Sequence, residues 1–451
     1  MDNKFKKIFL LVGDIIILYL SLYLTLLFRY WPQPSFAAWQ IHIWPFTIIF
    51  FVWLIVFYIA DLYNLFLAVN NSKFFQRTIK SVSIAGLLSA AFFYLNPGIG
   101  IAPKTNLLIY LIVFAAIFTA WRRFFNWLLN AYLPKNNLLI IGYNNQVKEL
   151  VTALQANPHL GYKVAAIVNT EPVNENDIKS ITEVRDIKNC VLTEKISIII
   201  LAADPHHSDD LSAALFPCLP LKINFISLSN FYELITGKVP IEVINQIWFF
   251  ENLSEGSKSL FDLIKRAYDI IFAFIILVLT LIFWPLIGLI IKVASRGSIF
   301  FKQARIGKDS RPFTMIKFRT MREAGNDRSP TAKNDTRITL FGNFLRKTRI
   351  DEIPQVLNIL AGDMSFVGPR PEQPELVVKL EKEVPFYRER MLVKPGLTGW
   401  DQISGEYHSP SREDTLKKLQ YDLFYIKNRS LYLDLSIILK TIATVLSRAG
   451  V

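Results

Sequence analysis

Cysteine and histidine are scarce in this sequence, which has two cysteines and five histidines among 451 residues. The two cysteines, Cys190 and Cys218, do not form a Cys-x-x-Cys pair. A disulfide framework and a structural zinc site are therefore not expected. The first apolar run, residues 8–28, is too long for the core of a cleavable signal peptide, and no small-residue cleavage site follows it. We expect this run to be retained.

The middle of the chain lacks the glycines of a dinucleotide-binding fingerprint. Apolar runs alternate with polar helical stretches over residues 136–245, which predicts a parallel α/β sheet with right-handed crossovers. The predicted strands are Leu138–Ile141, Val164–Val168, Ile196–Leu201 and Ile223–Ile226. Only the first glycine of Gly-x-Gly-x-x-Gly follows the first strand, as Gly142, and no catalytic Tyr-x-x-x-Lys is present. These absences favour a structural Rossmann-like domain, with an anion at the helix N-terminus after Gly142 as the alternative.

Acidic residues are outnumbered, and the formal net charge is +13. Much of the excess is local, because residues 292–350 hold 15 Lys or Arg against 4 Asp or Glu. A basic face of this kind serves nucleic acid, anionic lipid or phosphorylated substrates. Nucleic acid is the least favoured of the three, because the basic block directly follows an apolar segment of membrane length. We therefore predict no nucleic-acid partner.

Long apolar segments are abundant at the start of the chain. Four segments approach the roughly 20 residues that a helix needs to cross the hydrocarbon. They cover about residues 8–28, 43–60, 79–95 and 107–128. One set of flanks is rich in cations, namely Lys4, Lys6, Lys7, Lys73, Arg77, Lys80, Arg122 and Arg123. The other flanks carry only Arg29 and Lys104, so the positive-inside rule places both ends of the bundle in the cytoplasm.

Asp14 lies inside the first of these segments. A carboxylate within a membrane span is a functional candidate by default. Because Asp14 is near the predicted cytoplasmic end, we interpret it as solvated at the interface, and a functional role is the alternative.

A fifth apolar segment, residues 270–291, contains no charged residue. A fifth crossing would place the basic block outside, against the positive-inside rule, and cations flank the segment on both sides. Trp284-Pro285 offers a solution, because proline interrupts the helical hydrogen bonds. We predict a re-entrant helix over about residues 267–293, broken at Pro285, that enters the membrane and returns. An ordinary span kinked at Pro285 is the alternative.

Two adjacent carboxylates, Asp351 and Glu352, stand at the centre of residues 335–372. Apolar residues at helical spacing predict a helix that begins near Asp351, with Pro354 in its first turn. The positive helix N-terminus and the preceding cations Arg346, Lys347 and Arg349 should favour the ionised form of both carboxylates. An ionised aspartate can attack phosphorus, and its neighbour can hold a metal ion. Taken alone, an Asp-Glu pair in a first turn is usually only a complement to the helix dipole.

Four ordered blocks resemble the bacterial sugar transferases, the polyprenyl-phosphate hexose-1-phosphate transferases. They are FKQARIGKDSRPFTMIKFRTM at 301–321, the central stretch with DEIPQ and GPRP at 335–372, VKPGLTGWDQISG at 393–405, and YDLFYIKNRSLYLDLSIILKT at 421–441. The resemblance covers about residues 260–445. Asp401 is a departure, because many members have a small or apolar residue there. The N-terminal half resembles long-form members more loosely.

The resemblance implies a reaction and a set of site residues. Asp351 would attack the β-phosphate of a UDP-sugar, UMP would leave, and undecaprenyl phosphate would then take the sugar phosphate from Asp351. Glu352 would coordinate Mg²⁺. The remaining implied residues bind phosphate or nucleotide, or form the break in the re-entrant helix: Arg319, Arg346, Arg370, Gly396, Thr398 and Pro285. The basic and aromatic residues near Arg319, Lys317 among them, are left undecided.

We therefore predict a membrane α-helical bundle at 1–133, a cytoplasmic α/β Rossmann-like domain at 134–250, and an α-rich mixed catalytic domain with a re-entrant membrane helix at 260–451. Residues 431–449 should form an amphipathic helix on the membrane surface, with Asp434, Ser436, Lys440 and Thr441 as its polar side. The resemblance implies a bacterial inner membrane enzyme with its catalytic domain on the cytoplasmic face. It further implies a homodimer and the start of an exopolysaccharide, capsule or O-antigen unit.

Two rival functions remain at this stage. One is a nucleotide-sugar-modifying oxidoreductase built on the middle domain, which the missing glycines and the missing Tyr-x-x-x-Lys oppose. The other is a non-catalytic membrane scaffold for polysaccharide assembly, which the intact set of Asp351, Glu352, Arg346 and Arg370 opposes. No motif identifies the sugar, and none shows whether the middle domain binds a ligand.

Overall fold

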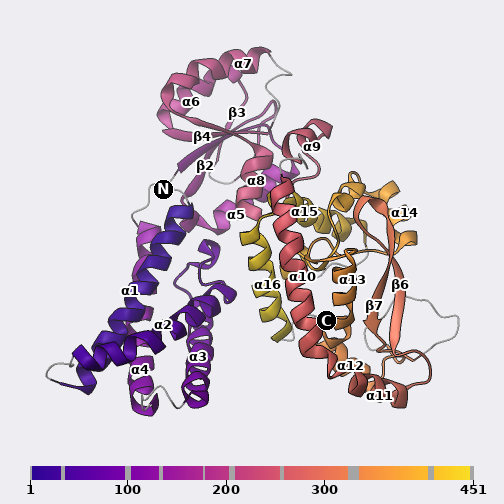
Figure 1. Ribbon diagram of the computed structural model, residues 1–451. Helices are drawn as coiled ribbons and strands as arrows, with labels where there is room; N and C mark the ends of the chain where they lie inside the picture. Colours follow the sequence, from indigo (N-terminus) through magenta and orange to yellow (C-terminus); the bar gives the residue numbers. More distant parts are fainter. Residues whose placement is uncertain are drawn as a thin grey trace. The chain divides into compact units, whose positions relative to one another are not determined.

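Four long helices occupy the first part of the chain (Figure 1). They are α1 (Asn3–Arg29), α2 (Phe36–Ile59), α3 (Ser72–Leu95) and α4 (Pro103–Ala131). All four are long and apolar enough to cross a membrane, which confirms the predicted membrane bundle. The computed structural model describes residues 3–31, 36–96, 103–131, 136–175, 178–202, 209–253, 258–322, 335–404 and 411–446. These residues form two compact units, Met1–Leu228 and Ser229–Val451, and each is described by itself.

A buried ion pair joins α1 to α4 inside the bundle. Arg122 Nη2 lies 2.5 Å from Asp14 Oδ2, and Trp121 Nε1 donates to Asp14 Oδ1 at 3.0 Å. Arg122 also donates to the carbonyl of Leu62 at 2.7 Å, and Asp14 is fully buried. The interpretation of Asp14 as an interfacial, solvated residue is therefore wrong. The carboxylate is held by Arg122 of the neighbouring helix α4. From the sequence, Arg122 was only one of the cations that flank the fourth apolar segment.

A parallel five-stranded sheet follows the bundle, with the order β3-β2-β1-β4-β5. Its strands are β1 (Asn136–Ile141), β2 (Tyr162–Val168), β3 (Lys179–Ile181), β4 (Ile196–Leu201) and β5 (Asn224–Ser227). The helices of this part are α5 (Asn145–Ala156), α6 (Ile187–Thr193) and α7 (Asp209–Leu215). The four predicted strands and the Rossmann-like sheet are confirmed, and only the short β3 was not predicted. Asn144 Oδ1 caps α5 by accepting from Val147 N at 2.9 Å. One backbone amide at the helix N-terminus where an anion was the alternative prediction is therefore already paired with a side chain.

The second unit begins with two short helices, α8 (Leu228–Thr236) and α9 (Gln246–Asn252). Val239 and Trp248 belong to the same buried apolar cluster as Val356 and Leu423. Residues 229–250, which the sequence analysis assigned to the Rossmann-like domain, therefore pack within the second unit.

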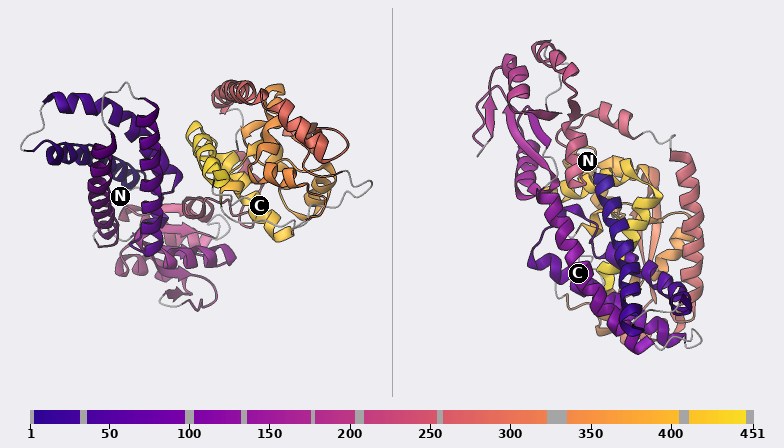
Figure 2. Two further views of the ribbon diagram at one scale, coloured as in Figure 1. Left: turned by 90° about the horizontal axis from the view of Figure 1, so that it is seen from below. Right: turned by 90° about the vertical axis from the view of Figure 1, so that its left-hand side faces the viewer.

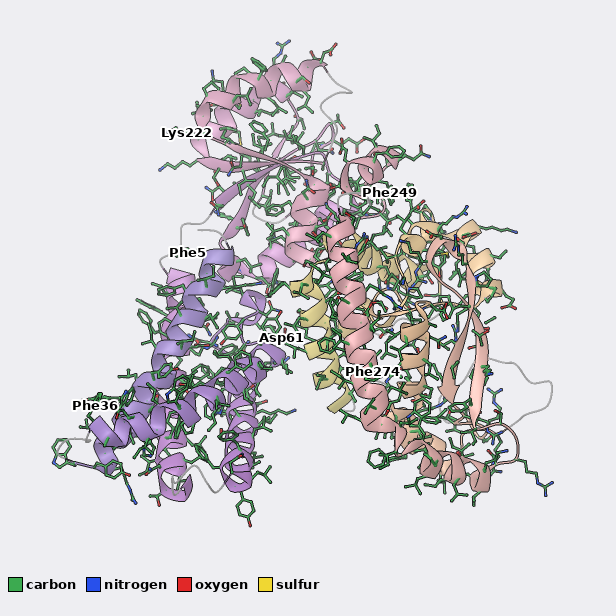
Figure 3. The ribbon with its side chains drawn as sticks, viewed as in Figure 1. Phe5, Phe36, Asp61, Lys222, Phe249 and Phe274 are labelled. Atoms are coloured by element: carbon green, nitrogen blue, oxygen red, sulfur yellow. The ribbon has the colours of Figure 1, made fainter. Side chains whose placement is uncertain are left out.

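A broken apolar helix pair comes next, α10 (Ser259–Leu281) and α11 (Trp284–Ala294), bent by 63°. The bend lies beside Pro285, where the sequence predicted it, and Thr280 Oγ1 accepts from Trp284 Nε1 at 3.3 Å across the break. The labelled Phe274 lies in the second half of α10 and is more than half exposed (Figure 3). An apolar side chain in that state is typical of a surface that meets lipid or a partner.

The rest of the second unit combines a hairpin, a small parallel pair of strands and five helices. The strands are β6 (Phe300–Ile306) with β7 (Pro312–Phe318), which are antiparallel, and β8 (Ser365–Val367) with β9 (Gly396–Thr398), which are parallel. The helices are α12 (Leu340–Lys347), α13 (Val356–Ala361), α14 (Pro374–Glu383), α15 (Arg412–Asn428) and α16 (Leu431–Leu446). The α-rich mixed domain is therefore confirmed.

The polar side of α16 faces the protein. Asp434 is buried and accepts hydrogen bonds from Lys265 and Tyr268 of α10 and from Tyr425 of α15. Figure 1 and both views of Figure 2 show α10 and α16 on neighbouring parts of the unit. The exposed side chains of α16 are largely apolar, namely Leu431, Tyr432, Leu435 and Ile442. The predicted amphipathic helix is present over the described residues up to Leu446, with its polar groups paired within the domain and its apolar side chains exposed. Its position on a membrane surface stays a prediction.

Candidate functional site

The two central carboxylates lie on a 3₁₀ helix, Ile350–Gln355, which leads into α13 at Val356. The helical turn that the sequence predicted near Asp351 is present, but it is 3₁₀ rather than α-helical, and Pro354 lies inside it. Arg349 precedes it with a φ of 56°. This left-handed residue sets off the turn from α12, so Asp351 and Glu352 begin a new element. Both carboxylates are 8% exposed.

Three cations converge on one oxygen of Glu352. Lys317 Nζ lies 2.8 Å from Glu352 Oε1, Arg370 Nη2 3.3 Å and Arg349 Nη1 3.7 Å. Burial alone would raise the pKa of Glu352, but Arg370, Lys317 and Arg349 outweigh burial and lower that pKa to about 2. Glu352 is therefore a permanent anion, as the sequence led us to expect.

Asp351 behaves in the opposite way to its neighbour. Burial, and then the negative charge of Glu352, raise the pKa of Asp351 to about 6, against the pull of Lys317, Arg349 and Arg346. The expectation that its surroundings favour the ionised form is therefore wrong, because the sequence does not show how far the carboxyl is removed from water. Asp351 is still mostly ionised at neutral pH. Its Oδ1 is buried and accepts no hydrogen bond from any residue that the structure describes.

Lys317 reaches the carboxylates from β7. Asn358 of α13 fastens this strand, because its Oδ1 accepts from Ile316 N at 3.1 Å and its Nδ2 donates to Thr314 O at 2.7 Å. The helix that follows the carboxylates thus holds the strand that supplies their cation. The sequence analysis left the role of Lys317 undecided. Its alternation with buried Phe318 was a signal for a strand, but the pairing of β7 with α13 could not be seen.

Arg370 projects from a loop that lies against β9. Gly368 N donates to Thr398 O at 2.9 Å, and Gly396 N donates to Pro369 O at 3.0 Å. A Cβ atom on Gly396 would come within 2.1 Å of Gly368 N, so glycine is required there by backbone packing. Thr398 Oγ1 lies 2.7 Å from Thr441 Oγ1. The structure therefore places the predicted binding residues Gly396 and Thr398 beneath the loop that carries Arg370.

The other predicted arginines have different surroundings. Arg346 of α12 donates from Nε to Thr320 Oγ1 at 2.8 Å, and the charge of Asp351 acts on it. Arg319 is buried and donates to the carbonyls of Ser295 and Arg296, each at 2.8 Å, just after α11. The structure thus brings Asp351, Glu352, Arg346 and Arg370 together. Two donors of Arg319 hold the end of the broken apolar helix pair, so its phosphate role stays a prediction.

An apolar cavity of about 280 Å³ adjoins the carboxylates. Ile350 and Ile353, on either side of the Asp-Glu pair, form part of its wall. The remaining wall comes from the α10–α11 break, α11 and α12, including Phe283, Trp284 and Phe344. Charged groups and an apolar cavity therefore lie on one short 3₁₀ helix. A ligand with a phosphate at one end and a hydrocarbon at the other matches this arrangement.

The carboxylates are compatible with Mg²⁺ as the resemblance implies. Among the described residues, no three acidic, histidine or cysteine side chains gather into a complete protein cage. Mg²⁺ is commonly held by one or two carboxylates together with substrate phosphates and water. The ionised carboxylate of Glu352 could supply one such ligand.

Comparisons with known proteins relate the chain to two described families. A family model described as bacterial sugar transferase matches residues 260–448, and one described as CoA-binding domain matches residues 58–224. A UDP-N-acetylgalactosamine-undecaprenyl-phosphate N-acetylgalactosaminephosphotransferase of Aeromonas hydrophila is 38% identical over 238 residues, 52% of this chain and 55% of the relative. A UDP-glucose:undecaprenyl-phosphate glucose-1-phosphate transferase of Xanthomonas campestris is 45% identical over 172 residues, 37% of this chain and 36% of the relative.

These two alignments span about half and about a third of the relatives' own lengths. A third relative, the uncharacterized sugar transferase EpsL of Bacillus subtilis, is 37% identical over 193 residues. That alignment covers 42% of this chain and 90% of the relative. The chain belongs to the bacterial sugar transferase family.

Proposed function

We propose that this protein transfers a sugar 1-phosphate from a UDP-sugar to undecaprenyl phosphate, releasing UMP and forming undecaprenyl-diphosphate-sugar. The observation that carries the proposal is the contrast between the two carboxylates. Glu352 is held ionised by three cations, whereas Asp351 has a pKa of about 6 and an Oδ1 that accepts no hydrogen bond from the described residues. A poorly solvated carboxylate oxygen beside a cluster of cations is suited to attack on phosphorus. The names of the relatives supply the substrate classes.

The proposed reaction has two displacements. Asp351 Oδ1 bonds to the β-phosphorus of the UDP-sugar, the bond from that phosphorus to the bridging oxygen breaks, and UMP leaves with the electron pair. An oxygen of the lipid phosphate then attacks the same phosphorus, the Asp351–phosphorus bond breaks, and the carboxylate is restored. Arg346 and Arg370 would hold the phosphates, because a guanidinium binds their oxygens bidentately. Mg²⁺, with Glu352 as its proposed ligand, would supply neutralisation of the diphosphate charge.

The apolar features support the proposed binding of a lipid substrate. The cavity beside Ile350 and Ile353 would receive the first part of the polyprenyl chain while its phosphate meets the cations. The 63° bend between α10 and α11 supports a re-entrant helix with both ends in the cytoplasm. We infer a protein of the bacterial inner membrane with its catalytic domain on the cytoplasmic face. On the family resemblance, it acts as a homodimer and starts an exopolysaccharide, capsule or O-antigen unit.

UMP release by the purified full-length protein tests the proposal. The assay uses a panel of UDP-sugars with Mg²⁺ and undecaprenyl phosphate, for wild type, Asp351→Asn and Asp309→Asn. Asp309 is an exposed aspartate of the same unit with a φ of 55°, a conformation that asparagine also adopts. We expect UMP from at least one sugar with wild type and Asp309→Asn, and a loss of at least about 1,000-fold in Asp351→Asn, as for other essential nucleophiles. Full activity in Asp351→Asn would refute the nucleophile.

A further inference from the structure

The loop that carries Arg370 is fastened at every carbonyl from Pro369 to Glu372. Two of the donors are backbone amides, Gly396 N to Pro369 O at 3.0 Å and Ile306 N to Glu372 O at 3.0 Å. The other two donors are arginine side chains. Arg305 Nη1 donates to Pro371 O at 3.1 Å, and Arg390 Nη2 donates to Arg370 O at 3.0 Å. Arg390 is thus bonded to the very residue whose guanidinium meets Glu352.

Arg390 is itself held rigidly. It is 5% exposed, its Nε donates to Asp422 Oδ2 at 3.0 Å, and its Nη1 donates to the hydroxyl of Tyr387 at 2.8 Å. Asp422 of α15 is 2% exposed. Such a pair is weak grounds for a role in stability, because desolvating two charges offsets most of their attraction. The hydrogen bond from Arg390 Nη2 to Arg370 O says more about the role of Arg390, because it links the ion pair to the backbone of the Arg370 loop.

We propose that Arg390, anchored by Asp422, is a positioning residue that aims Arg370 at the Asp351–Glu352 pair. The inference rests on the proposed function for its catalytic consequence. Prolines at 369 and 371 restrict the backbone on both sides of Arg370 and bias it toward an extended conformation. Rotation of the Arg370–Pro371 peptide plane remains, and the hydrogen bond from Arg390 to Arg370 O fixes that plane. Arg370 Nη2 then lies 3.3 Å from Glu352 Oε1.

Two substitutions at Arg390 distinguish the effect of its hydrogen bonds and charge from the effect of its side-chain size. Arg390→Met keeps the length of the side chain and removes all donors, whereas Arg390→Lys keeps the charge beside Asp422. We expect Arg390→Met to lower kcat/KM for UMP release about 10- to 100-fold, as for a lost hydrogen bond from a charged group. Arg390→Lys should recover at least part of that loss. Lys427→Met removes another partly buried ion pair of the unit, at 2.9 Å from Glu233, and should stay within about twofold of wild type.

A double-mutant cycle distinguishes a positioning role from a general structural one. In an Arg370→Lys background, Arg390→Met should cost less than about twofold, because the side chain that it aims is already altered. An equal loss in the wild-type and Arg370→Lys backgrounds would overturn the proposal. The cycle requires a wild type that releases UMP, and failure of that release refutes the proposed function alone.

Amide hydrogen exchange of the full-length protein tests the tether without any activity. Arg390→Met should speed exchange of residues 366–373 by about tenfold or more, since local opening follows the lost hydrogen bond, and Arg390→Lys should speed it by less. Exchange of β7, residues 312–318, should stay as in wild type. Unchanged exchange at 366–373, or faster exchange spread evenly over both segments, would show that Arg390 does not position the Arg370 loop.

Discussion

Asp351 and Glu352 are adjacent in sequence and equally buried, yet their surroundings move their pKa values in opposite directions. The cations contact mainly Glu352 Oε1 and keep Glu352 ionised. The pKa of Asp351 is raised by burial and by the negative charge of Glu352. We expect kcat/KM to fall about tenfold per pH unit below pH 6 and to level off above about pH 7, because the attacking form of Asp351 is the ionised one. A pH series of UMP release checks this. If kcat/KM reached half of its maximum near pH 4 instead, burial would not control the pKa of Asp351.

The same contrast predicts opposite effects on stability. The folded-state pKa of Asp351 is raised to about 6, so its ionisation costs stability as the pH rises from about 4 to 6, and Asp351→Asn removes that cost. Glu352 has a lowered pKa of about 2, so its ionisation stabilises the fold above about pH 4.5, and this contribution is lost as the pH falls toward 2. At pH 7.5, Asp351→Asn should increase the free energy of unfolding by about 1–3 kcal/mol, and Glu352→Gln should decrease it by about the same amount. The midpoint of thermal unfolding, which should rise for the first variant and fall for the second, checks this. Shifts of the same sign would contradict this account.

Sequence reasoning found the central carboxylates and two of their arginines through motif and resemblance. It missed Lys317, because the contact of β7 with α13 depends on Asn358, a residue without a visible chemical signal. It also gave Asp351 the wrong direction of pKa shift. Nearby cations can be counted along a chain, but the extent of burial follows only from three-dimensional packing.

At the scale of elements, length and apolar content predicted the four bundle helices and four of the five strands of the parallel Rossmann-like sheet. The three-residue β3 has too few residues to show a pattern, and the sequence of α16 could not show that its polar side is paired with α10 and α15. In α1, an intramembrane carboxylate could be located, but not its partner Arg122, which is 108 residues away. Periodicity identifies elements, and their partners come from packing.

The α10–α11 break supports a topological prediction at this scale. Ser259→Cys and Ser298→Cys place single thiols at exposed positions at the start of α10 and after the end of α11, in a background without Cys190 and Cys218. If the broken pair is re-entrant, a membrane-impermeant maleimide added to inside-out vesicles should label both positions. Right-side-out vesicles should leave both unlabelled. Labelling of the two positions from opposite sides would establish a kinked span instead.

At the scale of the whole chain, the transferase part extends further toward the N-terminus than the family match. The match begins at residue 260, but the compact unit begins at Ser229. Val239 N donates to Gln420 O at 3.1 Å, and Trp400 Nε1 donates to Gly237 O at 2.9 Å. Residues 229–253 therefore complete the core around α15 rather than merely link two domains.

This extension predicts how the chain can be divided. An alignment of 193 residues covers 90% of the Bacillus subtilis relative, so a transferase part without a long N-terminal region exists in the family. We expect a membrane-inserted fragment of residues 228–451 to release UMP within about fivefold of the full-length rate. The matched fragment 260–451 removes buried Val239, Ile241, Ile244 and Trp248. Because each such side chain contributes about 1.5–3 kcal/mol on burial, this fragment should unfold at a much lower temperature. Equal stability and activity of the two fragments would show that α8 and α9 are dispensable. A loss of activity from both, with 228–451 still folded, would show instead that catalysis depends on the membrane bundle or the Rossmann-like domain.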